Sequence, residues 1–347
     1  MRAAVWKDTG ILQVCEVPTP TAGPGEVLLK VISAGVCVTD LHVYTGKIRY
    51  GRPPHILGHE IAGLVVALGP GTDTAWLGRR AVVETSVGCG HCPACRRGDR
   101  HLCPGMTEIG FTPHPGGYAQ YVCVPQGNLV EIPDGVSFDE AGILESVVCP
   151  AGSLMRLGVG FGETVAVLGV GPAGLAYIQT ARLLGAARVI AVARNDDSLE
   201  RARRFGADAV VNTRTGDAAA ALRELTNGQG PSLVIEAAGA PQTVALAFDI
   251  VGVGGRVILY GIPGQEQKLE FPVQQIILRQ LSVYGTVGNP HVWRPLLDYV
   301  RRGRLNLRDM VTHTFALEDI DAAFAAIQDR TRPIVKAVVH PWEGETA

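Results

Sequence analysis

The chain has 347 residues, and its formal net charge of −2 gives no electrostatic reason to bind nucleic acid or an anionic membrane. Its longest apolar run, ETVAVLGVGPAGLAYI, is broken by Gly, Pro and Glu, and its first residues, MRAAVWKDTG, lack the apolar core of a signal peptide. We therefore expect a cytoplasmic protein of two domains that binds neither nucleic acid nor membrane. Its eight cysteines should then be metal ligands or core residues rather than disulfides.

Residues 1–150 contain short β-branched runs such as EVLLKVISAGV and EIAGLVVALG, separated by glycine- and proline-rich turns. This pattern predicts an irregular, β-rich domain. Two of its segments, AGVCVTDLHVYTGK and ILGHEIAG, carry side chains suited to metal binding or proton transfer. These are Cys37, Thr39, Asp40, His42, His59 and Glu60. A lone Cys or His is more often a packed core residue than a ligand. These two segments therefore indicate a functional site only in combination with the other motifs of the chain.

The stretch CGHCPACRRGDRHLC carries four cysteines with the spacing C-x2-C-x2-C-x7-C: Cys89, Cys92, Cys95 and Cys103. Four thiolates at this spacing can surround one tetrahedral Zn²⁺ and complete its coordination shell. Such a site has no open position for a substrate, so we interpret the stretch as a structural zinc site. We expect His91 and His101, which lie within it, to be solvated loop residues.

From about residue 160 strand-like and helix-like segments alternate, which predicts a doubly wound parallel sheet of six strands. The first strand and helix flank VAVLGVGPAGLA, in which Gly169, Gly171 and Gly174 form G-x-G-x-x-G around Pro172 and Ala173. In this setting the motif predicts a dinucleotide site, because the glycines let backbone N–H groups approach a pyrophosphate closely.

The end of the second strand bears on the choice of cofactor. NAD enzymes usually carry Asp or Glu there to hold the ribose 2′-OH, whereas this chain has Ala193, followed by Arg194 and Asn195. Without the carboxylate a 2′-phosphate is not repelled, and Arg194 can pair with it. We therefore favour NADP(H) over NAD(H). In the alternative, Arg194 is a solvated residue and Asp196 or Asp197 reaches the ribose.

Taken together, these motifs resemble the zinc-dependent medium-chain alcohol dehydrogenases, in particular the polyol and threonine dehydrogenase-like branch. The resemblance covers nearly the whole chain and rests on CVTDLH, on GHE with the later Gly63 and Gly69, on the four-cysteine lobe and on the glycine-rich turn, in the family's order. It implies an α/β protein with a GroES-like catalytic domain over residues 1–152 and a Rossmann domain over 153–285. Residues 286–347 would complete the catalytic domain.

The resemblance also implies roles for the first two segments. Cys37 and His59 would be ligands of a catalytic zinc, with Glu145 as the third ligand and Glu60 as an alternative ligand or a nearby carboxylate. Ser146 stands where the polyol and threonine branches usually have Pro. Thr39 would accept the proton of the alcohol and His42 would relay it to solvent. The pocket-wall candidates are Tyr50, Phe111 and Trp293, while Cys15, Cys123 and Cys149 match no ligand position and are expected to pack.

The expected activity is reversible hydride transfer between an alcohol or polyol and a nicotinamide cofactor, with two zinc ions per chain and NADP(H) favoured. An NAD-linked polyol or amino-alcohol dehydrogenase is the alternative, and a catalytically silent, nucleotide-binding redox sensor is a further one. The family resemblance also implies a homodimer or homotetramer that pairs Rossmann domains edge to edge.

Overall fold

The computed structural model describes residues 1–264, 267–329 and 334–342, and it divides the chain into two compact units. Unit 1 contains Met1–Val148 and Asn289–Ala347, and unit 2 contains Cys149–Gly288. The chain passes between them within helix α4 (Glu145–Leu157) and again after Gly288. Among the described residues, no helix is long and apolar enough to span a membrane.

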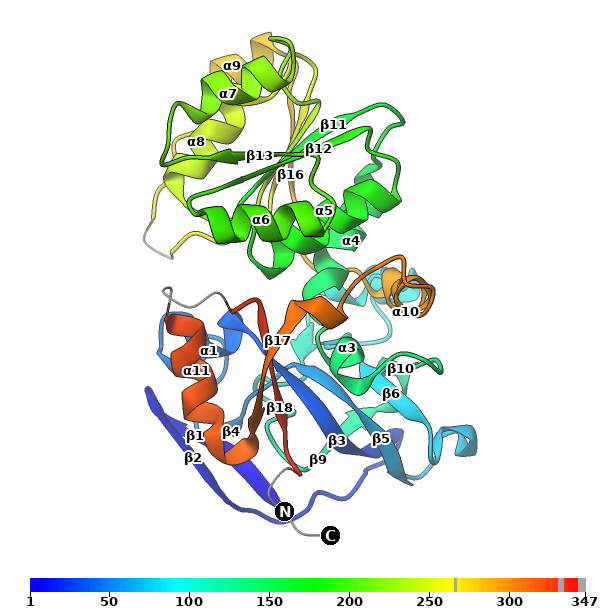
Figure 1. The fold of residues 1–347 in the computed structure, drawn as a ribbon. Helices are drawn as coiled ribbons and strands as arrows, with labels where there is room; N and C mark the ends of the chain where they lie inside the picture. Colours follow the sequence, from blue (N-terminus) through cyan, green and yellow to red (C-terminus); the bar gives the residue numbers. More distant parts are fainter. Residues whose placement is uncertain (265–266, 330–333, 343–347) are drawn as a thin grey trace. The chain divides into compact units, whose positions relative to one another are not determined.

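Unit 1 is built mainly from β-strands, as the short β-branched runs predict (Figure 1). Its strands are β1 (Arg2–Asp8), β2 (Ile11–Glu16), β3 (Glu26–Val36), β4 (His55–Ile56), β5 (Glu60–Leu68), β6 (Arg80–Val83), β7 (Ser86–Val87), β8 (Thr107–Glu108), β9 (Tyr121–Pro125), β10 (Leu129–Glu131), β17 (Val311–Ala316) and β18 (Lys336–His340). Its helices are α1 (Val38–Tyr44), α2 (Pro93–Arg96), α3 (Phe138–Gly142), α10 (Trp293–Arg301) and α11 (Ile320–Gln328).

The main sheet of unit 1 has the order β10-β6-β5-β3-β18-β17, with β9 also paired to β3. Strand β18 thus lies beside β3, although nearly 300 residues separate them, and Figure 1 shows this red strand beside the blue one. Alternate residues of β3 are fully buried in the apolar core of the unit. The C-terminal segment therefore completes the sheet that carries the first metal-binding segments.

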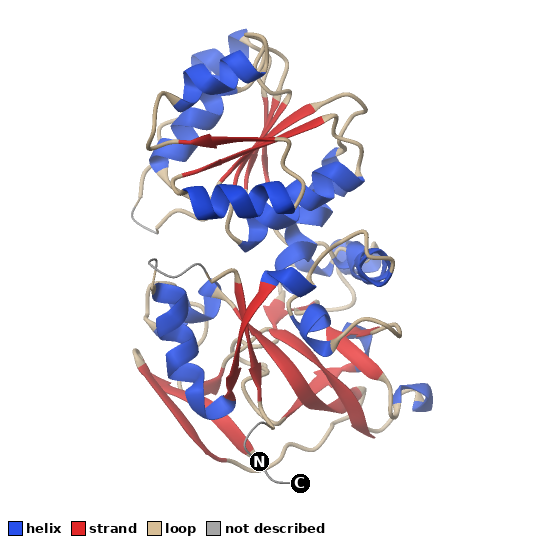
Figure 2. Cartoon of the chain, in the orientation of Figure 1, coloured by secondary structure: helices blue, strands red, loops and turns tan. Residues whose placement is uncertain are grey.

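Unit 2 is a parallel six-stranded sheet with helices on both faces (Figure 2). Its elements are β11 (Thr164–Leu168), α5 (Pro172–Leu183), β12 (Arg188–Ala193), α6 (Asp196–Arg204), β13 (Ala209–Asn212), α7 (Ala218–Leu225), β14 (Leu233–Glu236), α8 (Pro241–Ile250), β15 (Arg256–Leu259), α9 (Val273–Leu278) and β16 (Ser282–Gly285). The order β13-β12-β11-β14-β15-β16 is that of a dinucleotide-binding doubly wound sheet. The predicted fold class is therefore confirmed.

Candidate functional site

Three of the predicted metal-binding side chains meet where β3 and β5 lie side by side. Cys37 follows the last residue of β3 and is the N-cap of α1, while His59 immediately precedes Glu60, the first residue of β5. The two strands are antiparallel, with Gly35 opposite Glu60, so their ends bring these residues together. One potential ligand atom from each of Cys37, His59 and Glu60 lies within 4.8 Å of the other two.

Asp40 orients the His59 ring. Its Oδ1 accepts a hydrogen bond of 2.9 Å from His59 Nδ1, and its Oδ2 accepts one of 2.8 Å from the hydroxyl of the fully buried Tyr118. With its proton on Nδ1, the ring presents the lone pair of Nε2 to the other ligands. Burial lowers the pKa of His59, but Asp40 and Cys37 outweigh it and raise the pKa well above its ordinary value. Negative groups around His59 thus favour a cation at this place.

Glu60 is fully buried and pairs with Lys336 of β18. Lys336 Nζ lies 2.5 Å from Glu60 Oε1 and also donates to the backbone carbonyl of Val36 at 3.2 Å. Glu60 Oε2 is buried without a hydrogen-bond partner among the described residues. It also lies only 2.0 Å from where a Cβ on Gly35 would stand, so the glycine makes room for the carboxylate. An orphaned buried oxygen beside a thiol and an imidazole fits a metal ion as its missing partner.

Glu145, at the start of α4, also lies beside the metal-binding group. Its Oε2 lies 3.8 Å from His59 Nε2, and its side chain is 19 % exposed. Burial, opposed by His59 and aided by Glu60 and Glu108, raises the pKa of Glu145 to about 7. The set of one thiol, one imidazole and two carboxylates matches the donors that Zn²⁺ accepts, so the predicted ligands fit the metal.

Two predicted pocket residues lie beside His59. The Phe111 ring centroid is 5.3 Å from that of His59 and 4.8 Å from that of Tyr50. Burial and the carboxylate of Glu108, which accepts a hydrogen bond from the Tyr50 hydroxyl, raise the pKa of Tyr50. Trp293 is instead buried at the start of α10, and none of its described contacts connects it to His59.

The two predicted proton-transfer residues lie on α1, three residues apart. Thr39 Oγ1 is 3.6 Å from Cys37 Sγ, so this hydroxyl adjoins the metal-binding group. His42 Nε2 lies 3.3 Å from Lys47 Nζ, and burial followed by this ammonium group lowers the pKa of His42. Burial and Lys47 thus favour the neutral form of the His42 ring.

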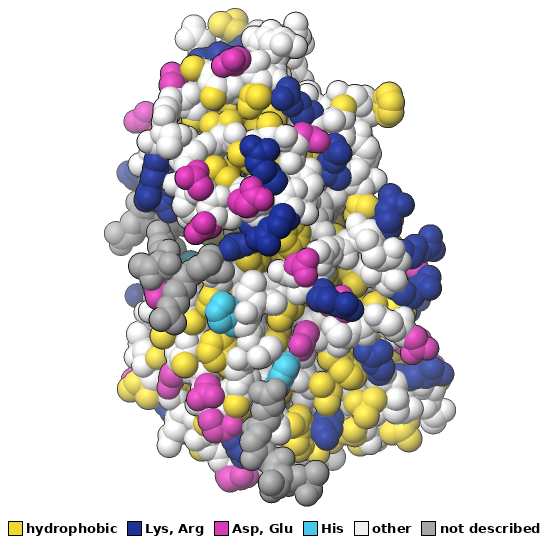
Figure 3. Space-filling model, viewed as in Figure 1, with side chains coloured by type: hydrophobic (Ala, Val, Ile, Leu, Met, Phe, Trp, Pro, Cys, Tyr) yellow, Lys and Arg dark blue, Asp and Glu magenta, His cyan; other side chains and the backbone are white. Residues whose placement is uncertain are grey.

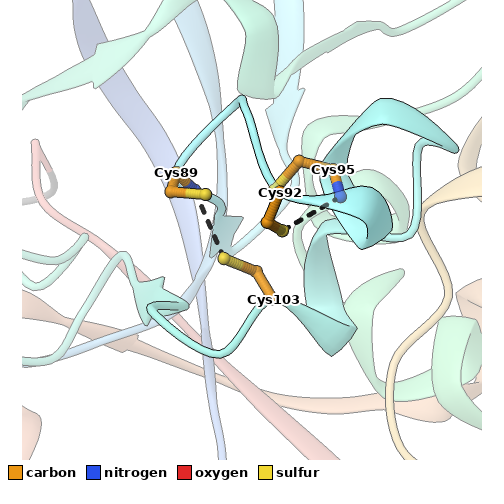
Figure 4. Close-up of side chains that lie close together, drawn as sticks. All are labelled: Cys89, Cys92, Cys95 and Cys103. Carbon is orange, nitrogen blue, oxygen red and sulfur yellow. Dashed lines mark hydrogen bonds between the residues drawn. The ribbon is translucent and has the colours of Figure 1, made fainter.

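The four-cysteine lobe forms a second group, in which the four Sγ atoms lie within 4.8 Å of one another (Figure 4). Backbone N–H groups point at the sulfurs: Cys89 N donates to Cys103 Sγ and Cys95 N to Cys92 Sγ, each at 3.4 Å. Such bonds stabilise thiolates, and N–H groups of the loop lower the pKa of Cys89 to about 6. The cluster fits a structural zinc.

Arg100 anchors this lobe to the rest of unit 1. Its guanidinium pairs with Glu84, a carboxylate that is 3 % exposed, and donates to the backbone carbonyl of Gly127 at 2.8 Å. Burial raises the pKa of Glu84 to about 7, although Arg100 opposes the rise. The lobe is therefore connected to the core through the buried side chain of Glu84 as well as through the chain.

The glycine-rich turn has the geometry that its motif predicts. Gly169 adopts φ +98°, which favours glycine, and a Cβ on Gly174 would stand 2.0 Å from the Gly169 carbonyl oxygen. Gly171 is the N-cap of α5, has no side-chain cap, and faces open space where a Cβ would stand. Pro172 and Ala173 open the helix, so the turn can receive a phosphate at the free N–H groups of α5.

The residues predicted to determine the preference for NADP(H) lie at the end of β12 and directly after it. Ala193 is its last residue and half-buried, and Arg194 and Asn195 after it are exposed. The side-chain oxygen of Asn195 accepts from Ser198 N at 2.8 Å, so it serves as the N-cap of α6.

The remaining candidates lie outside these groups. Cys15 and Cys123 are half-buried in β2 and β9. Cys149 Sγ accepts a hydrogen bond of 3.2 Å from Gly288 N. Ser146 donates to the Ile143 carbonyl at 2.7 Å.

Four residues lie around the metal-binding group without a specific predicted role: Asp40, which was only a candidate for metal binding or proton transfer, and Tyr118, Glu108 and Lys336. One signal for Lys336 was readable: it is the charged residue in the apolar run IVKAVV, and a buried lysine requires a partner. Asp40 also follows Cys37 at the spacing of a capping box, which the structure contains.

Comparisons with known proteins agree with this geometry. The family model described as alcohol dehydrogenase GroES-like domain matches residues 23–134, and the one described as zinc-binding dehydrogenase matches residues 172–302. The sorbitol dehydrogenase of Bacillus subtilis (strain 168) is 31% identical over 345 residues, which cover 98% of this chain and 97% of that protein. The L-threonine 3-dehydrogenase of Pyrococcus abyssi is 36% identical over 310 residues, covering 87% of this chain and 88% of its own.

Two solved structures are similar over almost the full length. A protein of Sinorhizobium meliloti 1021, described as a zinc-binding dehydrogenase and bound to NADP, is 32% identical with a TM-score of 0.91, covering 98% of this chain and 99% of its own. An alcohol dehydrogenase of Escherichia coli CFT073 complexed with NADH is 28% identical with a TM-score of 0.91 and the same coverage, 98% and 99%. The chain belongs to the zinc-dependent medium-chain alcohol dehydrogenases, in their polyol and threonine dehydrogenase branch, and is an oxidoreductase that uses zinc and a nicotinamide cofactor.

Proposed function

We propose that this protein is an NADP(H)-preferring dehydrogenase of polyols or amino alcohols whose reaction takes place at Cys37, His59 and Glu145. The observation that carries the proposal is the convergence of a thiol, an Asp40-oriented imidazole and carboxylates in one group whose His59 and Glu60 are buried. Cys37, His59 and Glu145 would hold a zinc ion that would supply a Lewis acid for the substrate oxygen, and a nicotinamide cofactor would supply the chemistry of hydride transfer. Glu60, which Lys336 holds by one oxygen, is the neighbouring carboxylate and alternative ligand.

Proton transfer is assigned to α1. In this proposal Thr39, beside Cys37, accepts the hydroxyl proton of the substrate, and His42, one helical turn further, takes the proton toward solvent. The lowered pKa of His42 suits this role because the ring is neutral when the proton arrives.

The distribution of charge supports the proposed substrate class. Glu60, Glu108 and Glu145 gather near one another, since the first two both raise the pKa of the third, and Lys336 opposes them. This surplus of carboxylates favours uncharged polyols or cationic amino alcohols over phosphorylated or acidic substrates. Replacing Glu108 with Gln should lower kcat/KM for an amino alcohol by about tenfold relative to an uncharged diol. An equal change of kcat/KM for both substrates would show that Glu108 does not determine the choice of substrate.

We further propose that the chain assembles as a homodimer or homotetramer through β16. This strand is an edge of the six-stranded sheet, and α9 has no buried residue. Val273, Ile277 and Leu278 on α9 are 60%, 67% and 73% exposed, which is unusual for apolar side chains that have no partner. A cytoplasmic location would keep the ligand cysteines reduced.

Initial rates with NAD⁺ and NADP⁺, measured on protein of known zinc content across polyols, diols, amino alcohols and secondary alcohols, test the proposal. The expected result is turnover of polyols or amino alcohols with NADP⁺ preferred. Preference for NAD⁺ would support the NAD-linked alternative. No turnover with either cofactor, on protein holding two zinc ions per chain, would contradict the catalytic assignment and support a redox sensor.

A further inference from the structure

Two arginines follow the neighbouring strands β12 and β13 at their carboxyl ends. The strands are parallel neighbours, with Ala193 opposite Asn212, and Thr213 N donates to the Ala193 carbonyl at 2.9 Å. Arg194 follows the first strand directly and Arg214 lies two residues beyond the second. The carboxyl ends of the strands of a doubly wound sheet face the cofactor, so both arginines lie on its side.

Both side chains are exposed, and among the described residues neither guanidinium has a hydrogen bond or ion pair. Other arginines of unit 2 do pair with carboxylates, through the contacts Arg182–Asp208, Arg223–Asp249 and Arg256–Glu163. Figure 3 shows acidic and basic side chains mixed over the face of unit 2 that carries α6, so the surroundings are not uniformly basic. Two neighbouring positive charges without a counter-ion favour a dianion between them.

Asp196, an acidic residue that could take the place of such an anion, is already engaged. Asp196 Oδ1 accepts a hydrogen bond of 2.8 Å from Asn212 Nδ2, and Asn212 Oδ1 accepts one of 2.9 Å from Arg214 N. Both ends of the Asn212 amide are therefore used, and Asp196 is held beside β13. Asp197 lies one helical turn from Arg201 and opposes the burial that lowers the pKa of Arg201.

We propose that Arg214 is a second determinant of cofactor choice, which together with Arg194 binds the 2′-phosphate of NADP(H). This inference rests on the proposed preference for NADP(H) and extends it to a residue on another strand. A planar guanidinium can donate two parallel hydrogen bonds to phosphate, so two arginines from adjacent strands can hold all three of its terminal oxygens.

Binding, rather than turnover, tests this directly. Dissociation constants for NADPH, NADH and adenosine 2′,5′-bisphosphate would be measured by calorimetry on the full-length protein for wild type, Arg194→Gln and Arg214→Gln. Arg203→Gln, which changes an exposed arginine on α6, is the matched control. We expect Arg214→Gln to weaken NADPH and the bisphosphate by about tenfold and NADH by less than about twofold, as for the loss of one charge-assisted contact. Arg203→Gln should change none of them by more than about twofold.

The outcomes separate this inference from the proposed function. If Arg194→Gln weakens NADPH but Arg214→Gln does not, the preference for NADP(H) holds and the role of Arg214 is wrong. Equal weakening of NADPH and NADH by Arg214→Gln would also overturn it, because the effect would not involve the 2′-phosphate. Wild-type protein that binds NADH as tightly as NADPH would refute the proposed preference itself, and this inference with it.

Discussion

Replacing Lys336 with methionine removes a buried positive charge while keeping most of the side chain's length. Lys336 is 3 % exposed and Glu60 is fully buried, and their charged atoms are 2.5 Å apart. Removing one partner of a buried ion pair leaves the other charge uncompensated and costs about 3–5 kcal/mol. For a unit of this size each kcal/mol lowers the melting temperature by about 2–4 °C, so the loss should be roughly 6–20 °C.

The assay is calorimetric or fluorescence-monitored melting of four proteins under one set of conditions: wild type, Lys336→Met, the double variant Lys336→Met/Glu60→Gln, and Lys7→Met. Lys7 is an exposed lysine of β1, and its replacement should change the free energy of unfolding by no more than about 0.5 kcal/mol. The double variant removes both charges and should recover most of the lost stability. A Lys336→Met protein that melts within about 2 °C of wild type, or a double variant without recovery, would refute the ion-pair reasoning.

Three further predictions concern the lobe, the helix α1 and the buried carboxylate. Cys95→Ser should reduce bound zinc from two ions to one per chain, as measured by atomic absorption. It should lower the melting temperature while kcat stays near that of wild type. A variant with an unchanged melting temperature and no turnover would instead assign catalysis to the lobe and a structural role to the other zinc site. His42→Ala should lower kcat for alcohol oxidation by about 10²-fold. It should also abolish the decrease of kcat at low pH, because the wild-type decrease reflects protonation of His42 below its lowered pKa. An unchanged pH profile of kcat would show that His42 does not transfer the proton. The pKa of Glu84 is about 7 in the folded protein and 4.5 in the unfolded chain. Between these two pH values the folded protein keeps the Glu84 proton and the unfolded chain has lost it. The free energy of unfolding should therefore fall by up to about 3 kcal/mol as the pH rises from 4.5 to 7. Glu84→Gln should flatten that part of the melting-temperature profile, and a parallel profile would show that another group titrates there.

The repeating units of the fold could be predicted from the sequence because their signals are local. Runs such as TVAVLGV and RVIAVA are continuous and apolar, as strands buried on both faces must be, and they lie where β11 and β12 form. The zinc lobe is equally local, since its four ligands lie within fifteen residues.

Features that depend on topology could not be predicted in this way. Because β18 lies between β3 and β17, Lys336 reaches Glu60, which lies 276 residues earlier in the chain. A local hydrophobic pattern does not predict a contact over such a sequence separation. The pairing of β12 with β13 likewise brings together the two strand ends that Arg194 and Arg214 follow. Helix α9 has no buried apolar face to mark it, because Val273, Ile277 and Leu278 remain exposed.

The insertion of β18 into the middle of a sheet has a consequence for how the protein is made. Translation proceeds at about 5–20 residues per second, so β3 leaves the ribosome well before its neighbour β18, nearly 300 residues later, has been synthesised. Unit 2, which is continuous in sequence, can fold during that interval, whereas the sheet beneath Cys37 and His59 must wait with an open edge. Unit 1 is therefore the part of the chain that most needs protection by chaperones, and its sheet is complete beneath Cys37 and His59 only after β18 has been synthesised.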